Sequence, residues 1–358
     1  MSPSSLLLQI LLIMVGCTGF MVLAFYIAIL VHEIGHVVAG RRAGMEFKSV
    51  LVGNLAVRKE ADGRLVPFWL GRIWAGGFTH MVLPDTLDAR SRYRRFILGG
   101  PVASLLWCAF TIALSFAGAM LLKEPRSPGA NIAVTSSAML AAVSILILPG
   151  TLSAKPVRGI PTDVCLLNRL REEGAGSNRL IAMTQLDRSI RLGQRERDWP
   201  PELIADALEV RDGGPEEMQA CTLAYYHYTD IGDLQTAEEV LERAFALRPK
   251  KDRDAGLAGQ SVIYLKAFTL ARAGNPLAAQ DVLKEVKKPL EFLDGNRAFT
   301  LAAIALAEGK GAEASAHLKA ARVALGQMAK LFPSNQEAAM ELLDKLQGEA
   351  KALVPVTP

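Results

Sequence analysis

The first 150 residues alternate long uncharged stretches with polar segments. Residues 2–31 contain no charged side chain, and residues 96–122 and 131–149 form two further apolar stretches. About 20 apolar residues are enough to cross the hydrocarbon core of a bilayer as a helix. The pattern predicts three membrane-spanning helices, at about 5–38, 96–122 and 131–149. The first stretch lacks a basic start and is too long for a secretory signal, so we expect an uncleaved helix.

The segment between the first two apolar stretches predicts a small β-structure. Residues 41–95 carry eleven Lys or Arg against five acids, and Asp62-Gly63 separates two sets of apolar residues. Asp-Gly between such sets is typical of a hairpin turn. We expect a β-hairpin insertion over 46–83 at the membrane surface, since its aromatic residues argue against a disordered basic loop. The basic segments 41–95 and 155–171 favour a cytoplasmic location, with the N-terminus outside.

From about Ser177 the chain becomes charged and rich in Ala and Leu. Three glycines each precede Ala at +5, Leu at +9 and a small apolar residue at +12. These units begin at Gly232, Gly274 and Gly309, and the matching residues are Ala237, Ala279, Ala314, Leu241, Leu283, Leu318, Ala244, Val286 and Ala321. Fixed offsets of small residues predict stacked helical hairpins. The pattern resembles tetratricopeptide repeats, whose groove would bind a peptide or protein, and an irregular helical bundle is the alternative.

These patterns predict a mainly α fold in two domains. Residues 1–172 would form a three-span helical core with the β-hairpin insertion, and residues 177–352 an α-helical repeat solenoid. Between them, residues 181–192 predict an amphipathic helix that either docks on the membrane or caps the repeats.

Composition narrows the class of protein. The chain is 51% hydrophobic and 21% charged, with a formal net charge of +4. This mixture fits a membrane domain joined to a water-soluble one. The mild charge and the lack of interleaved aromatic and basic residues argue against nucleic-acid binding. Four scattered cysteines form no CxxC pair, so we interpret them as small apolar residues.

The first apolar stretch ends in the pattern His32-Glu33-Ile34-Gly35-His36. On a helix, two His four residues apart lie on one face and can bind the same zinc ion, and the adjacent Glu can accept a proton from water. Charged and polar groups at membrane depth are costly and usually functional. The alternative is a helix end whose His side chains face the lipid headgroups.

A zinc site on this helix needs a third protein ligand, and Asp163 has the most suitable context. It follows the last apolar stretch in the Pro/Gly-rich segment 149–163. An Asp in such a place is usually a helix N-cap, and that interpretation stays open on the residues alone.

Four motifs in order resemble the site-2 protease family of intramembrane zinc metalloproteases. They are HEIGH, Gly76-Gly77-Phe78, Gly99-Gly100-Pro101 and Pro161-Thr162-Asp163, and the resemblance covers roughly the first half of the chain. It implies that His32, His36 and Asp163 bind one Zn²⁺ per chain and that Glu33 is the general base. It also implies substrate contacts at Gly76, Gly77, Gly99, Gly100 and Pro101.

The resemblance also implies the substrate and the location. Members of the family cut membrane-anchored regulatory proteins within the bilayer, so the expected partners are such a protein and the lipid itself. We expect a multi-pass protein of the cell inner (plasma) membrane with a cytoplasmic repeat domain.

Three positions depart from the family pattern. Ser104 replaces an Asn, Val164 replaces the Gly after the Asp, and Leu146 replaces a second Asn. They motivate an alternative function, a catalytically degenerate membrane adaptor that acts through its repeats. A soluble metallopeptidase on a membrane anchor is disfavoured, because the second half offers no further HExxH or comparable cluster.

Overall fold

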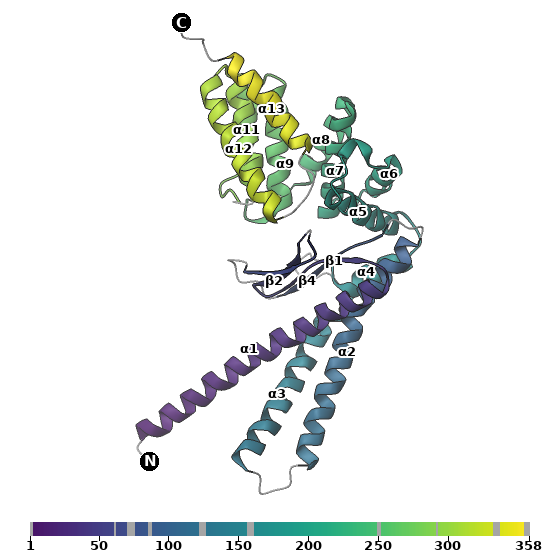
Figure 1. Cartoon of the computed structure of the whole chain (residues 1–358), viewed down its shortest axis with the longest axis vertical. Helices are drawn as coiled ribbons and strands as arrows, with labels where there is room; N and C mark the ends of the chain where they lie inside the picture. Colours follow the sequence, from purple (N-terminus) through teal and green to yellow (C-terminus); the bar gives the residue numbers. More distant parts are fainter. Residues whose placement is uncertain are drawn as a thin grey trace. The chain divides into compact units, whose positions relative to one another are not determined.

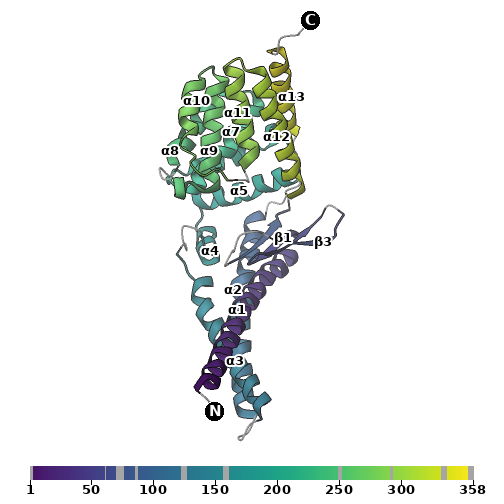
Figure 2. The same ribbon diagram turned by 90° about the vertical axis from the view of Figure 1, so that its left-hand side faces the viewer.

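A computed structural model describes the chain except for a few short segments. The described residues are 3–60, 62–69, 76–84, 88–121, 127–155, 161–248, 252–290, 293–331 and 337–353. Parts of the predicted β-insertion (residues 61 and 70–75) and of the turn after the second span (122–126) lie outside them. The chain divides into two compact units, Met1–Glu173 and Gly174–Pro358. Both units can be followed in Figures 1 and 2.

The first unit contains three helices that are long and apolar enough to cross a membrane. They are α1 (Pro3–Arg42), α2 (Ala89–Leu121) and α3 (Pro128–Thr151), with candidate spans at Leu11–Arg42, Ala89–Leu121 and Pro128–Thr151. The three predicted spans are therefore present, and the first is one uninterrupted helix. The second helix begins seven residues earlier than the predicted span, because the arginine-rich segment before it is also helical.

Helices α1 and α2 pack closely where each presents a glycine. A Cβ atom on Gly35 would collide with the backbone of Gly99, and one on Gly99 would collide with the backbone of Gly35. Small residues allow membrane helices to approach to backbone contact, where van der Waals packing supplies much of their association. This contact fixes the face of α1 that carries His32 and His36 against the first half of α2.

A four-stranded antiparallel sheet follows α1. Its strands are β1 (Glu46–Val52), β2 (Leu55–Lys59), β3 (Leu65–Trp69) and β4 (Gly77–Val82), in the order β3-β2-β1-β4. The predicted Asp62-Gly63 turn connects β2 to β3, which pair from Leu55↔Trp69 to Lys59↔Leu65. The sequence predicted one hairpin, whereas the sheet has four strands. The prediction missed the turn at Gly53, where φ is +58°, which splits the first apolar run into β1 and β2.

Helix α4 (Asp163–Arg171) packs against α2 and begins at the predicted third ligand. Its N-cap is Thr162, whose Oγ1 accepts a hydrogen bond from the backbone N–H of Cys165 at 3.3 Å. The capping interpretation of Asp163 was therefore wrong, and the Asp163 carboxylate is free to point elsewhere.

The second unit is entirely helical within its described residues. It contains α5 (Ala175–Arg191), η1 (Glu196–Asp198), α6 (Pro201–Glu209), α7 (Pro215–Ile231), α8 (Leu234–Leu247), α9 (Asp252–Arg272), α10 (Pro276–Leu283), α11 (Asp294–Ala307), α12 (Gly311–Leu331) and α13 (Glu337–Ala352). The amphipathic helix predicted at 181–192 is the C-terminal part of α5. Its apolar residues Ala182 and Leu186 are buried in the core of this unit.

The three glycines singled out in the second half form the turns of helix pairs. Gly232, Gly274 and Gly309 have φ of +85°, +79° and +75°, a conformation that glycine adopts most easily. They join α7 to α8, α9 to α10 and α11 to α12, and the members of each pair pack together. The alanines five residues later are buried in all three pairs. The pairing follows the sequence pattern, whereas a continuous solenoid is not established.

Candidate metal centre

One turn of α1 and the start of α4 bring three possible metal ligands together. His32 and His36 lie on the face that packs against α2, and Asp163 reaches them from the first residue of α4. His32 Nε2 lies 3.0 Å and His36 Nε2 lies 3.3 Å from Asp163 Oδ2. The two Nε2 atoms are 3.2 Å apart. Three residues predicted from the sequence therefore meet at one point, although Asp163 is separated from His36 by more than 120 residues.

The size of this triangle fits a zinc ion. Zinc bonds of about 2.0–2.1 Å in a tetrahedral arrangement place neighbouring ligand atoms roughly 3.3 Å apart. The three observed separations, 3.0, 3.2 and 3.3 Å, are those of one face of such a tetrahedron. Three protein ligands leave a fourth position for water, which is the arrangement of catalytic zinc sites.

The hydrogen bonds on the far sides of the imidazoles point to a cation. His36 Nδ1 lies 3.0 Å from the carbonyl oxygen of Phe96, which can only accept, so this nitrogen carries a proton. His32 Nδ1 lies 2.8 Å from Ser104 Oγ. When His32 also carries its proton on Nδ1, with Ser104 Oγ accepting, two nitrogen lone pairs and a carboxylate converge. Three acceptors at this separation repel one another unless positive charge lies between them.

Asp163 is ionised in this setting. Burial of its carboxyl raises the pKa, but the adjacent imidazoles of His32 and His36 outweigh burial and bring the pKa to about 2. The carboxylate is therefore negatively charged at neutral pH, and carboxylate oxygens are among the donors that bind zinc.

Glu33 lies beside this triangle in a slot made by β4. Its side chain is buried, and one oxygen, Oε2, accepts a hydrogen bond of 2.6 Å from Thr79 Oγ1. Two residues earlier on the same strand, a Cβ on Gly77 would collide with the other oxygen of Glu33. Alternate residues of a strand lie on one face. Strand β4 therefore gives Glu33 both space and a hydrogen-bond donor.

The glycines that we expected to contact substrate lie within this framework. Gly99 touches Gly35, and a Cβ on Gly100 would collide with the imidazoles of His36 and His32. Pro101 is buried within α2, and the carbonyl of Gly76 accepts a hydrogen bond from Gly53 N. The structure thus gives these residues close contacts inside the protein, and their contact with a substrate stays a prediction.

Sequence reasoning missed two side chains of the site. Thr79 was not singled out, and Ser104 was considered only as a departure from a family pattern. The spacing Gly77-x-Thr79 on a strand and Gly100-x-x-x-Ser104 on a helix would have placed both hydroxyls on the same face as a noted glycine. Only the packing of β4 and α2 against α1 tells which face that is.

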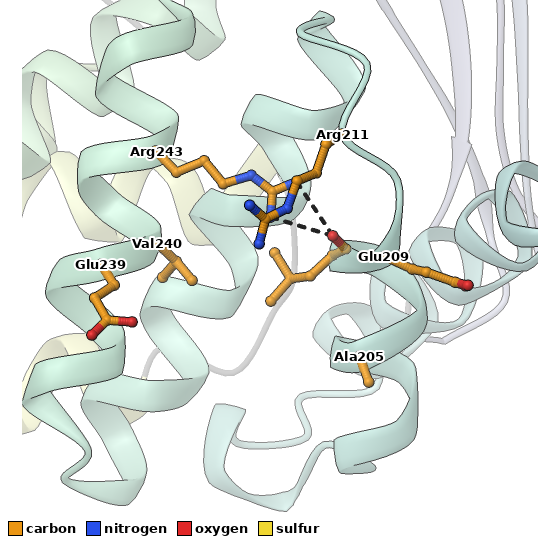
Figure 3. A pocket seen from close by; sticks show the side chains of 7 residues that line it. Ala205, Glu209, Arg211, Glu239, Val240 and Arg243 are labelled. Carbon is orange, nitrogen blue, oxygen red and sulfur yellow. Dashed lines mark hydrogen bonds between the residues drawn. The ribbon is translucent and has the colours of Figure 1, made fainter.

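A separate hollow of about 530 Å³ opens in the second unit between α6 and α8. Figure 3 shows Arg243 extending from α8 toward the end of α6. Its guanidinium binds Glu217 at 2.6 Å and the carbonyl oxygen of Val210 at 3.0 Å. This arginine caps the end of α6 and joins it to α8, so its first role is structural.

Three apolar helices with an HExxH turn and a converging carboxylate define a membrane-spanning zinc metallopeptidase. Consistent with this class, the model of peptidase family M50 matches residues 20–345. The chain therefore belongs to peptidase family M50, the site-2 protease family. The match continues through most of the second unit, so it is much longer than the first-half resemblance predicted. No curated protein and no solved structure matches the chain.

Proposed function

We propose that this chain is an intramembrane endopeptidase that hydrolyses peptide bonds of membrane-anchored regulatory proteins. The observation that supports this most is the convergence of His32, His36 and Asp163 beside Glu33, where both His residues and Glu33 lie on a helix apolar enough to cross a bilayer. In this proposal the two imidazoles and the carboxylate hold one Zn²⁺ per chain. Bound zinc would act as a Lewis acid and lower the pKa of water at the fourth position.

Glu33 is the general base in this proposal. Its carboxylate is held at the side of the ligand triangle by Thr79, where it can take the proton of the attacking water and pass it to the leaving amine. Burial of Glu33 excludes competing bulk water from this proton transfer.

Strand β4 offers a means of binding the substrate. Among the described residues it pairs only with β1, so we propose that an extended peptide adds to its other edge. A substrate segment that added to this edge would be held by backbone hydrogen bonds near Gly76 and Gly77, next to Glu33. This arrangement requires the substrate helix to unwind before cleavage.

The second unit would recruit a substrate or a regulator. Its glycine-joined helix pairs resemble tetratricopeptide repeats, and a solenoid of such pairs presents a concave surface to peptides. We place this unit in the cytoplasm, following the basic segments that flank the spans, in a cell inner (plasma) membrane.

The direct test is cleavage of a membrane-tethered substrate by the Glu33→Gln protein in proteoliposomes. We expect no cleavage with zinc content unchanged, because the amide keeps the shape of the side chain but cannot accept the proton. Glu46→Gln, an exposed strand residue of the same unit, is the matched control and should cleave normally. Unchanged turnover by Glu33→Gln would reject the proposal.

The adaptor alternative rests on the three departures from the family pattern. The contact of Ser104 with His32 weakens it, because that position still supplies the site with a polar partner. Purified protein without zinc, together with retained partner binding by the second unit, would favour the adaptor.

A further inference from the structure

We propose that Ser104 is a positioning residue for the metal site. Its hydroxyl accepts a hydrogen bond from the Nδ1–H of His32 and so directs the Nε2 lone pair of that imidazole at the metal. The inference rests on the proposed zinc-dependent function and concerns a residue outside the ligand set. Ser104 Oγ lies 2.8 Å from His32 Nδ1 and joins α2 to α1 across 72 residues of sequence.

The two imidazoles of the site are held in different ways. The partner of His36 is a backbone carbonyl, which fixes the proton on Nδ1 whatever happens at Nε2. The partner of His32 is a hydroxyl, which can either accept or donate. Only when Ser104 accepts does His32 keep a free lone pair on Nε2. Binding of a cation by His32 therefore requires one of the two orientations of the Ser104 hydroxyl.

The local structure of α2 is built for this contact. Gly100 leaves the space in which both imidazoles lie, and Ser104 follows one turn later on the same face. By comparison, the Thr111 hydroxyl further along α2 bonds to Cys108 O of its own helix. Ser104 instead directs its oxygen out of α2 toward a metal ligand.

The physical consequence is a rigid imidazole with one defined tautomer. A hydrogen-bond partner on the outer nitrogen orients the ring and makes the inner nitrogen a better ligand, and loss of such a partner typically lowers metal affinity or activity 10- to 100-fold. In this chain the Ser104 hydroxyl would orient His32 as the Phe96 carbonyl orients His36. The departure from the family pattern at this position would then preserve metal binding.

The test compares the rate of zinc loss from four full-length proteins in detergent. Wild type, Ser104→Ala, Ser104→Thr and Ser115→Ala are loaded with zinc and mixed with an excess of chelator. Ser115 lies on the same helix and is the matched control for loss of a hydroxyl. We expect Ser104→Ala to release zinc about 10- to 100-fold faster than wild type. Ser104→Thr, which keeps the hydroxyl, should return to within a few-fold of the wild-type rate, and Ser115→Ala should match wild type.

Two results would overturn the inference. One is release of zinc by Ser104→Ala at the wild-type rate. If the KM for substrate rises in that variant while zinc release is unchanged, Ser104 acts on substrate and the inference is wrong. The other is equally fast release from Ser104→Thr and Ser104→Ala, because the hydroxyl would then be irrelevant. The visible spectrum of the cobalt-loaded proteins should agree with the zinc release rates: it should change in Ser104→Ala and match wild type in Ser104→Thr and Ser115→Ala.

A measurement on the unaltered protein covers the case in which Ser104→Ala does not fold. Nitrogen-15 magnetic resonance of the zinc-loaded wild type should show His32 protonated and hydrogen-bonded at Nδ1. A proton on Nε2 of His32 would overturn the inference without any substitution. Failure of the proposed function is distinguishable from this outcome: a Glu33→Gln protein that still cleaves rejects the function, whatever the tautomer of His32. A wild-type chain that binds no zinc overturns both.

Discussion

The Thr79 hydroxyl donates a hydrogen bond of 2.6 Å to the Glu33 carboxylate, and the two residues come from different elements 46 positions apart. The same hydroxyl lies 3.2 Å from the backbone carbonyl oxygen of Glu33. A β-strand and a membrane helix are thereby connected at the residue proposed as the general base. The β-insertion thus helps to hold the proposed general base, in addition to its proposed role in substrate binding.

Replacing Thr79 by Val should slow catalysis and leave metal binding intact. The substitution removes the donor at nearly constant volume, so the Glu33 carboxylate loses its fixed position; small displacements of a catalytic group can cost up to about 100-fold. We expect kcat to fall about tenfold or more with zinc content unchanged. Thr79→Ser, which keeps the hydroxyl, should retain most activity. Equal rates for Thr79→Val and wild type would contradict a positioning role.

A methyl group at Gly35 should disrupt the contact of α1 with α2. The added Cβ would collide with the backbone of Gly99, so the helices must separate. We expect Gly35→Ala to lower the thermal unfolding midpoint in detergent and to weaken zinc retention. Gly16→Ala on the same helix is the control, since a Cβ there meets nothing within 4 Å. A similar midpoint for the two variants would show that the close approach is not needed.

An ion-pair network in the second unit should contribute measurably to its stability. Asp230 at the end of α7 accepts hydrogen bonds from Arg195 and Arg197, each with one nitrogen at 3.0 Å. Arg195 also binds Glu341 of α13 at 2.7 Å. Charged hydrogen bonds in partly buried positions contribute about 1.5–3 kcal/mol. We expect Asp230→Asn to lower the free energy of unfolding by about that amount, measured by urea denaturation. The exposed Asp281→Asn should change it by less than about 0.5 kcal/mol.

The same aspartate predicts a pH dependence of stability. Burial raises the pKa of Asp230, but hydrogen bonds from Arg197 and Arg195 lower the pKa by more than burial raises it, so the net shift is downward. A carboxyl with a lowered folded-state pKa stabilises the fold above its unfolded value, about 3.9, and this contribution is lost as the pH falls below that value. The difference in unfolding free energy between wild type and Asp230→Asn should therefore shrink from pH 6 toward pH 3. A difference that is constant over this range would assign the effect to packing.

Local patterns in the sequence predicted the parts of the site whose residues are close together along the chain. His32, Glu33 and His36 lie within one helical turn, and the length of the apolar stretches predicted the three candidate spans. The position of Asp163 depends on how α4 packs on α2, and the residues alone favoured a capping role that Thr162 fills instead. The place of Asp163 beside the imidazoles was predicted by the resemblance to the site-2 protease family, in which the four motifs occur in the same order.

The hydroxyl partners could not be predicted in the same way. Thr79 and Ser104 are ordinary residues for a strand and a membrane helix, and their roles depend on which face of β4 and α2 packs against α1. In the second unit, the regular offsets predicted the turns at Gly232, Gly274 and Gly309. The offsets did not predict that α10 ends at Leu283, before the third position of its unit, Val286.

The ligand set itself is tested most directly by zinc X-ray absorption on the purified Glu33→Gln protein, which should hold metal without turning over. The account predicts two imidazole nitrogens and oxygen donors at about 2.0–2.1 Å, and loss of the bound zinc in Asp163→Ala. Sulfur ligands at about 2.3 Å, or an unchanged zinc environment in Asp163→Ala, would contradict it.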